Sequence, residues 1–152
     1  MKKLLLLLAA VVCISTTASA QDKGDWAIMP RIYTAWDADT VFGIGAAARY
    51  NVLDQLRLEP ALTLLCHDGC SIDLNCDVHY LFPVADRWNL YPLAGISVND
   101  FGDWSAGINL GAGFDYAVAD RWDITAGLKY MIETHKNWSN PLIISVGASY
   151  RF

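Results

Sequence analysis

The segment Leu142-Ile-Ile-Ser-Val-Gly-Ala-Ser-Tyr-Arg-Phe152 closes the chain and decides its fold class. Apolar or aromatic side chains recur at every second position from Leu142 to Phe152, and serine, glycine and arginine hold most positions between them. Such a period of two is typical of a β-strand with one apolar and one polar face. The sequence therefore predicts a strand that ends the chain on an aromatic residue.

The first twenty residues have the three parts of an export signal. Lys2 and Lys3 precede an apolar stretch, Leu4–Ile14, and small residues ending at Ala20 follow it. This order is typical of a cleaved secretory signal, and the apolar stretch is too short to cross a bilayer, which takes about 20 residues. We predict a cleaved signal peptide over 1–20, with cleavage after Ala20.

The composition bounds the classes of function. Without the signal peptide, 132 of the 152 residues remain, residues 21–152, which is enough for one domain. Loss of Lys2 and Lys3 takes the formal net charge from −5 to −7, which argues against a nucleic-acid partner. Hydrophobic residues make up 54% of the chain, yet no apolar run in the mature part is long enough for a spanning helix. The apolar residues are therefore interleaved with polar ones, as in a membrane barrel.

The two-residue period recurs in eight segments. We predict that they form the strands of one antiparallel barrel: Trp26–Trp36, Val41–Val52, Leu56–Cys66, Ile72–Phe82, Trp88–Val98, Ser105–Val118, Trp122–Glu133 and Leu142–Phe152. Segments of about 10–14 residues are long enough to cross a bilayer at a tilt.

Three of the connections share a short motif with an aspartate at the bend. The motif occurs at Val52–Leu56, Val84–Trp88 and Val118–Trp122, once per predicted hairpin pair. We therefore expect these turns on one rim, with both chain ends on the same side. The four remaining connections are short and belong to the other rim: Asp37–Thr40, His67–Ser71, Asn99–Trp104 and His135–Pro141.

Alternation alone does not say which face of the barrel points outward, and a soluble lipocalin-type barrel is the alternative. Aromatic residues gather near the strand ends: Trp26, Tyr50, Tyr80, Phe82, Trp88, Tyr116, Trp122 and Phe152 at one rim, and Trp36, Phe42, Trp104 and Trp138 towards the other. Two such girdles are typical of membrane barrels. Glycines lie on the polar face, where a crowded lumen needs room. The sequence therefore favours an apolar exterior.

The mature chain resembles the small eight-stranded barrels of Gram-negative outer membranes, such as the transmembrane domain of outer-membrane protein A and its short relatives. The strand number, the short aspartate turns and the ending Tyr150-Arg-Phe152 carry this resemblance. It implies an all-β, up-and-down transmembrane barrel in the outer membrane, a monomer surrounded by lipid and lipopolysaccharide. It also implies that Tyr150 and Phe152 form the signal read by the barrel-assembly machinery, with periplasmic chaperones acting before insertion.

Charged side chains on the polar faces are predicted to form a lumen network: Arg31, Arg49, Arg57, Glu59, Asp73, Asp77, His79, Asp115, Asp123, Lys129, Glu133 and Arg151. A gated ion path is one interpretation of these charges. A plug of paired charges is the favoured one, because an eight-stranded barrel is only wide enough for side chains to fill it.

A tight turn after Cys66 would place Cys66 opposite Cys70, and the strand pairing then follows. In that register Arg57 meets His79, and Glu59 meets Asp77 on the inner face. Two adjacent carboxylates repel each other, so we expect an arginine, Arg49 or Arg57, between them.

Three cysteines remain in the mature chain, an odd number in an oxidising compartment. Directly opposed strand residues have a spacing that a disulfide tolerates, so we predict a bond between Cys66 and Cys70. Cys76 is then a small lipid-facing residue. No metal or cofactor site is expected.

The predicted role is structural or a weak surface interaction, with no chemistry of its own. A narrow ion or small-solute channel is the first alternative. A lipid A-modifying enzyme is the second, because some barrels of similar size are deacylases or acyl transferases. The deacylase pattern needs a histidine and a serine two residues apart, and His67, His79 and His135 have no serine at that spacing. We therefore expect no enzyme and no catalytic residue.

Overall fold

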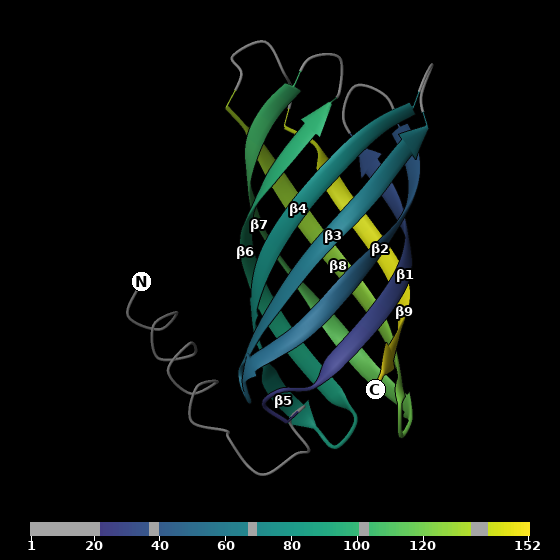
Figure 1. Cartoon of the computed structure of the whole chain (residues 1–152), viewed down its shortest axis with the longest axis vertical. Coiled ribbons are helices and arrows are strands. Elements are labelled where there is room, and N and C mark those ends of the chain that lie inside the picture. Colours follow the sequence, from purple (N-terminus) through teal and green to yellow (C-terminus); the bar gives the residue numbers. More distant parts are fainter. Residues whose placement is uncertain (1–21, 37–39, 67–69, 101–103, 135–139) are drawn as a thin grey trace, which may run out of the picture.

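The computed structural model describes residues 22–36, 40–66, 70–100, 104–134 and 140–152. The predicted signal peptide with its cleavage site at Ala20, and most of the four connections on the rim away from the turns, lie outside the described residues. Within them the chain forms one barrel of β-strands (Figure 1). The strands are β1 (Trp26–Trp36), β2 (Thr40–Leu53), β3 (Leu56–Cys66), β4 (Cys70–Tyr80), β5 (Phe82–Ala85), β6 (Trp88–Asp100), β7 (Trp104–Ala119), β8 (Trp122–Glu133) and β9 (Leu142–Arg151).

The barrel is closed and every neighbouring pair of strands is antiparallel. The order along the sheet is β4-β3-β2-β1-β9-β8-β7-β6-β5, and β4 also pairs with β6, which closes the ring. The short β5 continues β4 beyond Leu81, so the wall has eight strand positions and the predicted eight-stranded antiparallel barrel is confirmed. In the described part of the chain, no helix is long and apolar enough to cross a membrane.

The fourth predicted strand, Ile72–Phe82, is split in the structure. The register between β4 and β6 ends at His79 and Leu93, one pair before Tyr80 would meet Pro92. Proline has no amide hydrogen to donate to the ladder, so the pairing stops there and resumes in β5 at Phe82 and Leu90.

Two further prolines interrupt other seams of the wall. Pro30 in β1 pairs with Ala46 of β2, but the β1–β9 register skips from Ile28 to Arg31. Similarly, the β2–β3 register skips the positions of Pro60 and its neighbour Glu59. Each of these two prolines therefore lies at a gap in the hydrogen-bond ladder with one neighbouring strand, because proline has no amide hydrogen to donate.

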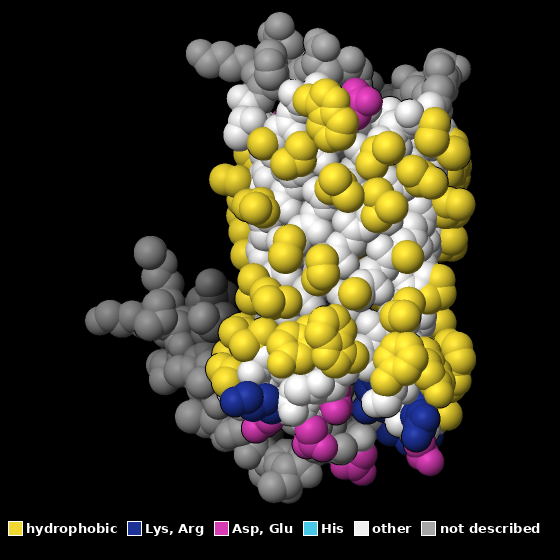
Figure 2. Space-filling model, in the orientation of Figure 1, with side chains coloured by type: hydrophobic (Ala, Val, Ile, Leu, Met, Phe, Trp, Pro, Cys, Tyr) yellow, Lys and Arg dark blue, Asp and Glu magenta, His cyan; other side chains and the backbone are white. Residues whose placement is uncertain are grey.

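The apolar side chains face outward and the charged ones inward. Leu62, Ile108 and Val146 are 45%, 49% and 45% exposed, whereas Arg57 is fully buried. Figure 2 shows hydrophobic side chains over the whole height of the visible wall, with most of the charged ones at the end that carries the turns and an acidic side chain near the opposite end. The soluble barrel is therefore excluded, because it would require the opposite arrangement.

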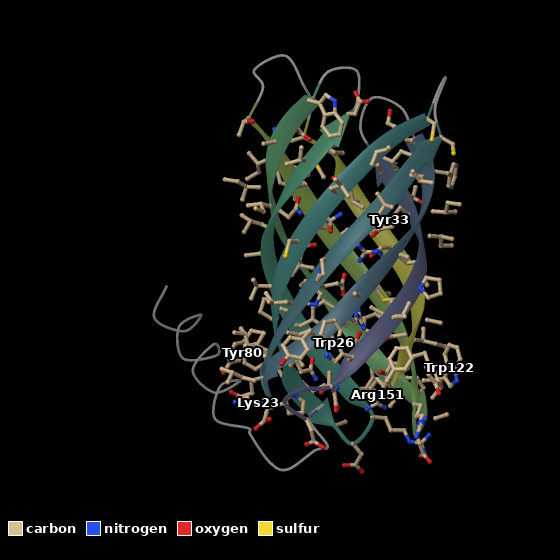
Figure 3. All side chains as sticks on the ribbon, in the orientation of Figure 1. Lys23, Trp26, Tyr33, Tyr80, Trp122 and Arg151 are labelled. Carbon is tan, nitrogen blue, oxygen red and sulfur yellow. The ribbon has the colours of Figure 1, made fainter. Side chains whose placement is uncertain are left out.

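The turn rim has the predicted aromatic girdle. Ring centroids lie 4.7 Å apart for Trp26 and Tyr50, and 5.0 Å apart for Trp122 and Tyr150. Figure 3 shows Trp26, Tyr80 and Trp122 at this same end of the barrel. The three aspartate turns join β2 to β3, β5 to β6 and β7 to β8 here, as predicted.

The residues before β1 are held against this rim. The Lys23 amide donates to the Asp54 carboxylate at 3.0 Å, and the Gly24 amide donates to the Asn51 carbonyl at 2.8 Å. Gly24 has a φ of +96°, a backbone conformation that residues other than glycine rarely adopt. Lys23 and Gly24 are thereby held beside the turn between β2 and β3.

Candidate functional site

A layer of ion pairs crosses the lumen at the level of Glu59. Glu59 on β3 accepts hydrogen bonds from Arg31 and from Arg49 Nε, the latter at 2.7 Å. Arg49 also donates to Asp115 Oδ1 at 3.1 Å, and Arg57 donates to Asp115 Oδ2 at 2.7 Å. Asp115 is on β7, which is not a neighbour of β2 or β3 in the wall. These pairs therefore span the barrel from one side to the other.

Two rings close the same layer. The His79 and Tyr91 rings are stacked, with centroids 4.5 Å apart and planes at 6°. Arg57 donates from Nε to His79 Nδ1 at 3.3 Å, and its guanidinium carbon lies 4.9 Å from the centre of the Tyr91 ring. Thr125 on β8 donates to Asp115 at 2.7 Å. Side chains of several strands thus fill the cross-section.

The next groups towards the outer rim belong to β4, β7 and β8. Lys129 Nζ lies 3.2 Å from Asp77, and Asn109 donates to the same carboxylate at 2.8 Å. Asn75 donates to Asp73 at 2.6 Å. Arg57 is opposite His79 and Glu59 opposite Asp77 in the β3–β4 register, as predicted.

The expected arginine between the two opposed carboxylates needs a correction. Glu59 binds Arg31 and Arg49, whereas Asp77 is paired with Lys129 from β8. The two acids therefore have separate cationic partners, because the curved wall brings groups from non-neighbouring strands into the lumen.

The two ends of the lumen are lined differently. At the turn end Arg151 Nε lies 3.2 Å from Asp123, beside a polar cavity of about 300 Å³. Near the outer end Glu133 accepts hydrogen bonds from Asn99 and Ser105. Arg151 and Glu133 are half-buried, and the other charged residues of the predicted network are buried.

Apolar side chains also lie inside the barrel, which the sequence analysis did not include. Tyr33, Ala35, Met131 and Ile143 form one buried cluster towards the outer end. Their signal was available, since Met131 alternates in phase with Lys129 and Glu133 on β8. The charges on that face predict a polar lining, whereas Met131 between them packs in an apolar cluster.

Glycines make room for this filling at close approaches. A Cβ on Gly95 would collide with Asp77, and one on Gly111 would collide with the backbone of Leu128 and Lys129. This agrees with the expected role of glycine on the crowded face.

In the described ranges, no three or more histidine, cysteine, aspartate or glutamate side chains are grouped so that they could hold a metal ion. His79 is buried in the ion-pair layer, away from the lipid-facing surface. The network is suited to bridging strands.

Cys66 and Cys70 are directly opposed in the β3–β4 register. Both are exposed thiols in the structure, as is Cys76. The predicted disulfide between them remains our proposal.

If this bond forms after export, Cys66 and Cys70 are expected to resist alkylation until they are reduced. Cys76 is expected to react at once in detergent. Mass analysis of alkylated protein checks this. Cys66→Ser should leave Cys70 reactive, and immediate alkylation of all three wild-type thiols would contradict the bond.

The chain end is integrated into the wall. The Phe152 amide donates to the Trp26 carbonyl at 3.0 Å, and its ring meets the Tyr150 ring edge-on at 5.4 Å. Phe152 is nevertheless 68% exposed, so a partner can reach it.

Comparisons with known proteins agree with the barrel fold. A family model described as an outer membrane protein beta-barrel domain matches residues 4–152. No curated protein matches the chain.

Several solved barrels are similar in structure. The N-terminal β-barrel domain of Pseudomonas aeruginosa OprF superimposes with a TM-score of 0.74 at 16% identity, over 87% of this chain and 100% of that one. Neisserial surface protein A gives 0.66 at 22% identity, over 86% and 98%. A de novo designed transmembrane β-barrel gives 0.65 at 18% identity, over 88% and 99%. At such identities the similarity shows the fold alone.

Proposed function

Because the chain belongs to the outer membrane protein β-barrel domain family, we propose that it is a monomeric structural barrel whose own side chains close its lumen. The observation that carries this proposal is the layer at Glu59, where Arg49 and Arg57 reach across to Asp115. An eight-stranded barrel has little more room than such side chains fill. The apolar cluster at Met131 adds a second closure, since dry constrictions oppose the passage of ions.

The proposed setting is the Gram-negative outer membrane, which the protein reaches through its cleaved signal peptide. We propose that periplasmic chaperones and the barrel-assembly machinery act on it, the latter through Tyr150 and Phe152. The exposure of Phe152 at the end of β9 supports this. Heat-modifiable gel mobility of protein extracted from outer membranes tests the setting, because a folded barrel migrates differently before and after boiling.

Closure of the lumen predicts an electrically silent protein. In planar bilayers the refolded mature chain is expected to give no steady openings above the bare membrane, because the Arg49–Asp115 pair and the Met131 cluster lie in series. Steady openings that change on Arg49→Ala or Glu133→Ala would contradict the plug and identify a channel.

The channel is the second candidate because of one feature, the polar cavity beside Arg151 and Asp123 at the turn end. Such an opening is what an ion path would need, but the filled layer lies beyond it.

An enzyme acting on lipid A is the third candidate. We propose that the protein has no such activity. Mass analysis of lipid A from cells with and without the protein checks this, and the expected result is an unchanged acyl pattern.

A further inference from the structure

Two apolar hollows interrupt the outward wall at mid-height. One, of about 480 Å³, lies over β2, β3, β4 and β6 and is lined by Ala48, Pro60 and Cys76 among others. The other, of about 680 Å³, lies over β9, β1, β2 and β3. Ala46 and Leu62 line both hollows, so the two form one depression divided by the Leu62 side chain.

Small side chains beside the two ladder gaps create the depression. Pro30 lines the larger hollow next to the gap between β1 and β9, and Pro60 lines the smaller one next to the gap between β2 and β3. Towards the outer rim Ile32 and Ile44 protrude, 63% and 61% exposed, and wall the depression off. Towards the turn rim the next outward side chain of β2 is the small Ala48, and Tyr50 of the aromatic girdle follows it.

The distance between the depression and the aromatic girdle fits the end of an acyl chain. Ala46 is four residues from Tyr50 of the aromatic girdle, which is about 13 Å along a strand at roughly 3.3 Å per residue. A tilt of about 40° reduces this to about 10 Å of depth, within the roughly 15 Å of half a bilayer core. A lipid with its headgroup at the girdle therefore brings its chain into the depression.

The rim beneath these strands carries both signs of charge. Lys23 and Asp54 are exposed and lie side by side, joined through the Lys23 amide. Lys23 and Trp26 lie at the same end in Figure 3. An ammonium can bind a lipid phosphate and a carboxylate can bind a lipid amine, so this rim complements a zwitterionic headgroup rather than an anionic one.

We propose that this face binds a zwitterionic phospholipid of the turn-side leaflet, with one acyl chain in the hollows at Ala46 and the phosphate at Lys23. The inference rests on the barrel lying in a bilayer with its apolar face outward.

Native mass spectrometry of the mature barrel with phosphatidylethanolamine tests the site. Ala46→Phe fills the floor of both hollows and is expected to lower the fraction of barrels that retain lipid at least threefold. Ala112→Phe is the matched control, because Ala112 also faces outward but lines neither hollow. Equal losses in the two variants, or no retained lipid in the wild type, would overturn the site.

Two further measurements identify the occupant. Asp54→Asn removes the carboxylate assigned to the lipid amine and keeps the acceptor for the Lys23 amide, so it should abolish any preference for phosphatidylethanolamine over phosphatidylglycerol, and an unchanged preference would overturn the headgroup contact. A photo-cross-linker on Cys76, with Cys66→Ser and Cys70→Ser, should yield a phospholipid adduct in outer membranes. An adduct with lipopolysaccharide or a second copy would overturn the assignment. Heat-modifiable mobility of each variant separates loss of the site from loss of the barrel.

Discussion

Replacing Glu59 with glutamine is expected to destabilise the barrel by about 3–5 kcal/mol, the usual cost of leaving buried charge without its partner. Glu59 is 2% exposed and binds Arg31 and Arg49, while Arg57 lies in the same layer. The layer holds three arginines against two carboxylates, and Glu59→Gln leaves only Asp115 to neutralise them. Glutamine has nearly the same shape as glutamate and can still accept a hydrogen bond. The measured loss of stability therefore reports the removal of the charge.

Urea unfolding of the barrel in lipid vesicles, followed by tryptophan fluorescence, measures this loss. Glu133→Gln is the matched control, because Glu133 is half-buried and its hydrogen-bond donors, Asn99 and Ser105, are neutral. We expect the control to cost about 1 kcal/mol. Equal effects of the two substitutions would show that the Glu59 layer does not hold the strands together.

Replacing Leu62 with arginine is expected to cost about 2–4 kcal/mol, the range for a cation on the lipid face near the bilayer midplane. Leu62 is outward-facing and lies at mid-wall, where hydrocarbon cannot hydrate the guanidinium. A side chain of this length can reach a headgroup only by bending along the wall.

Leu53→Arg is the control that distinguishes a lipid-facing wall from a water-facing one. Leu53 is 51% exposed and Leu62 is 45% exposed, so water around a soluble barrel would treat the two substitutions alike. Leu53 ends β2 at the turn rim, where the cost falls to about 0–1 kcal/mol. The same urea titration in vesicles compares them, and equal costs would contradict the membrane orientation.

The strand positions and one register could be predicted because they depend on short-range pattern. A tight turn after Cys66 fixes the pairing of β3 with β4, and a slip of one residue would turn every apolar side chain of the strand inward. The prolines were harder to interpret. Pro92 lies inside a predicted strand, and only the closed wall shows that it ends the pairing of β4 with β6.

The fold class, the outward apolar face, the turn rim and the parity that directs each charge into the lumen can all be predicted from sequence patterns. The strands and their parity follow from a period of two and the turn rim from a short motif, which are local patterns, whereas the outward face follows from the aromatic residues at the strand ends and the glycines on the polar face. Which charges meet depends instead on the closed barrel, as when Arg49 reaches Asp115 at a separation of 66 residues. The same holds for the pairing of Asp77 with Lys129 and for the apolar cluster at Met131. Such contacts depend on how a tilted sheet closes on itself, and closure brings together strands whose separation along the chain carries no pattern.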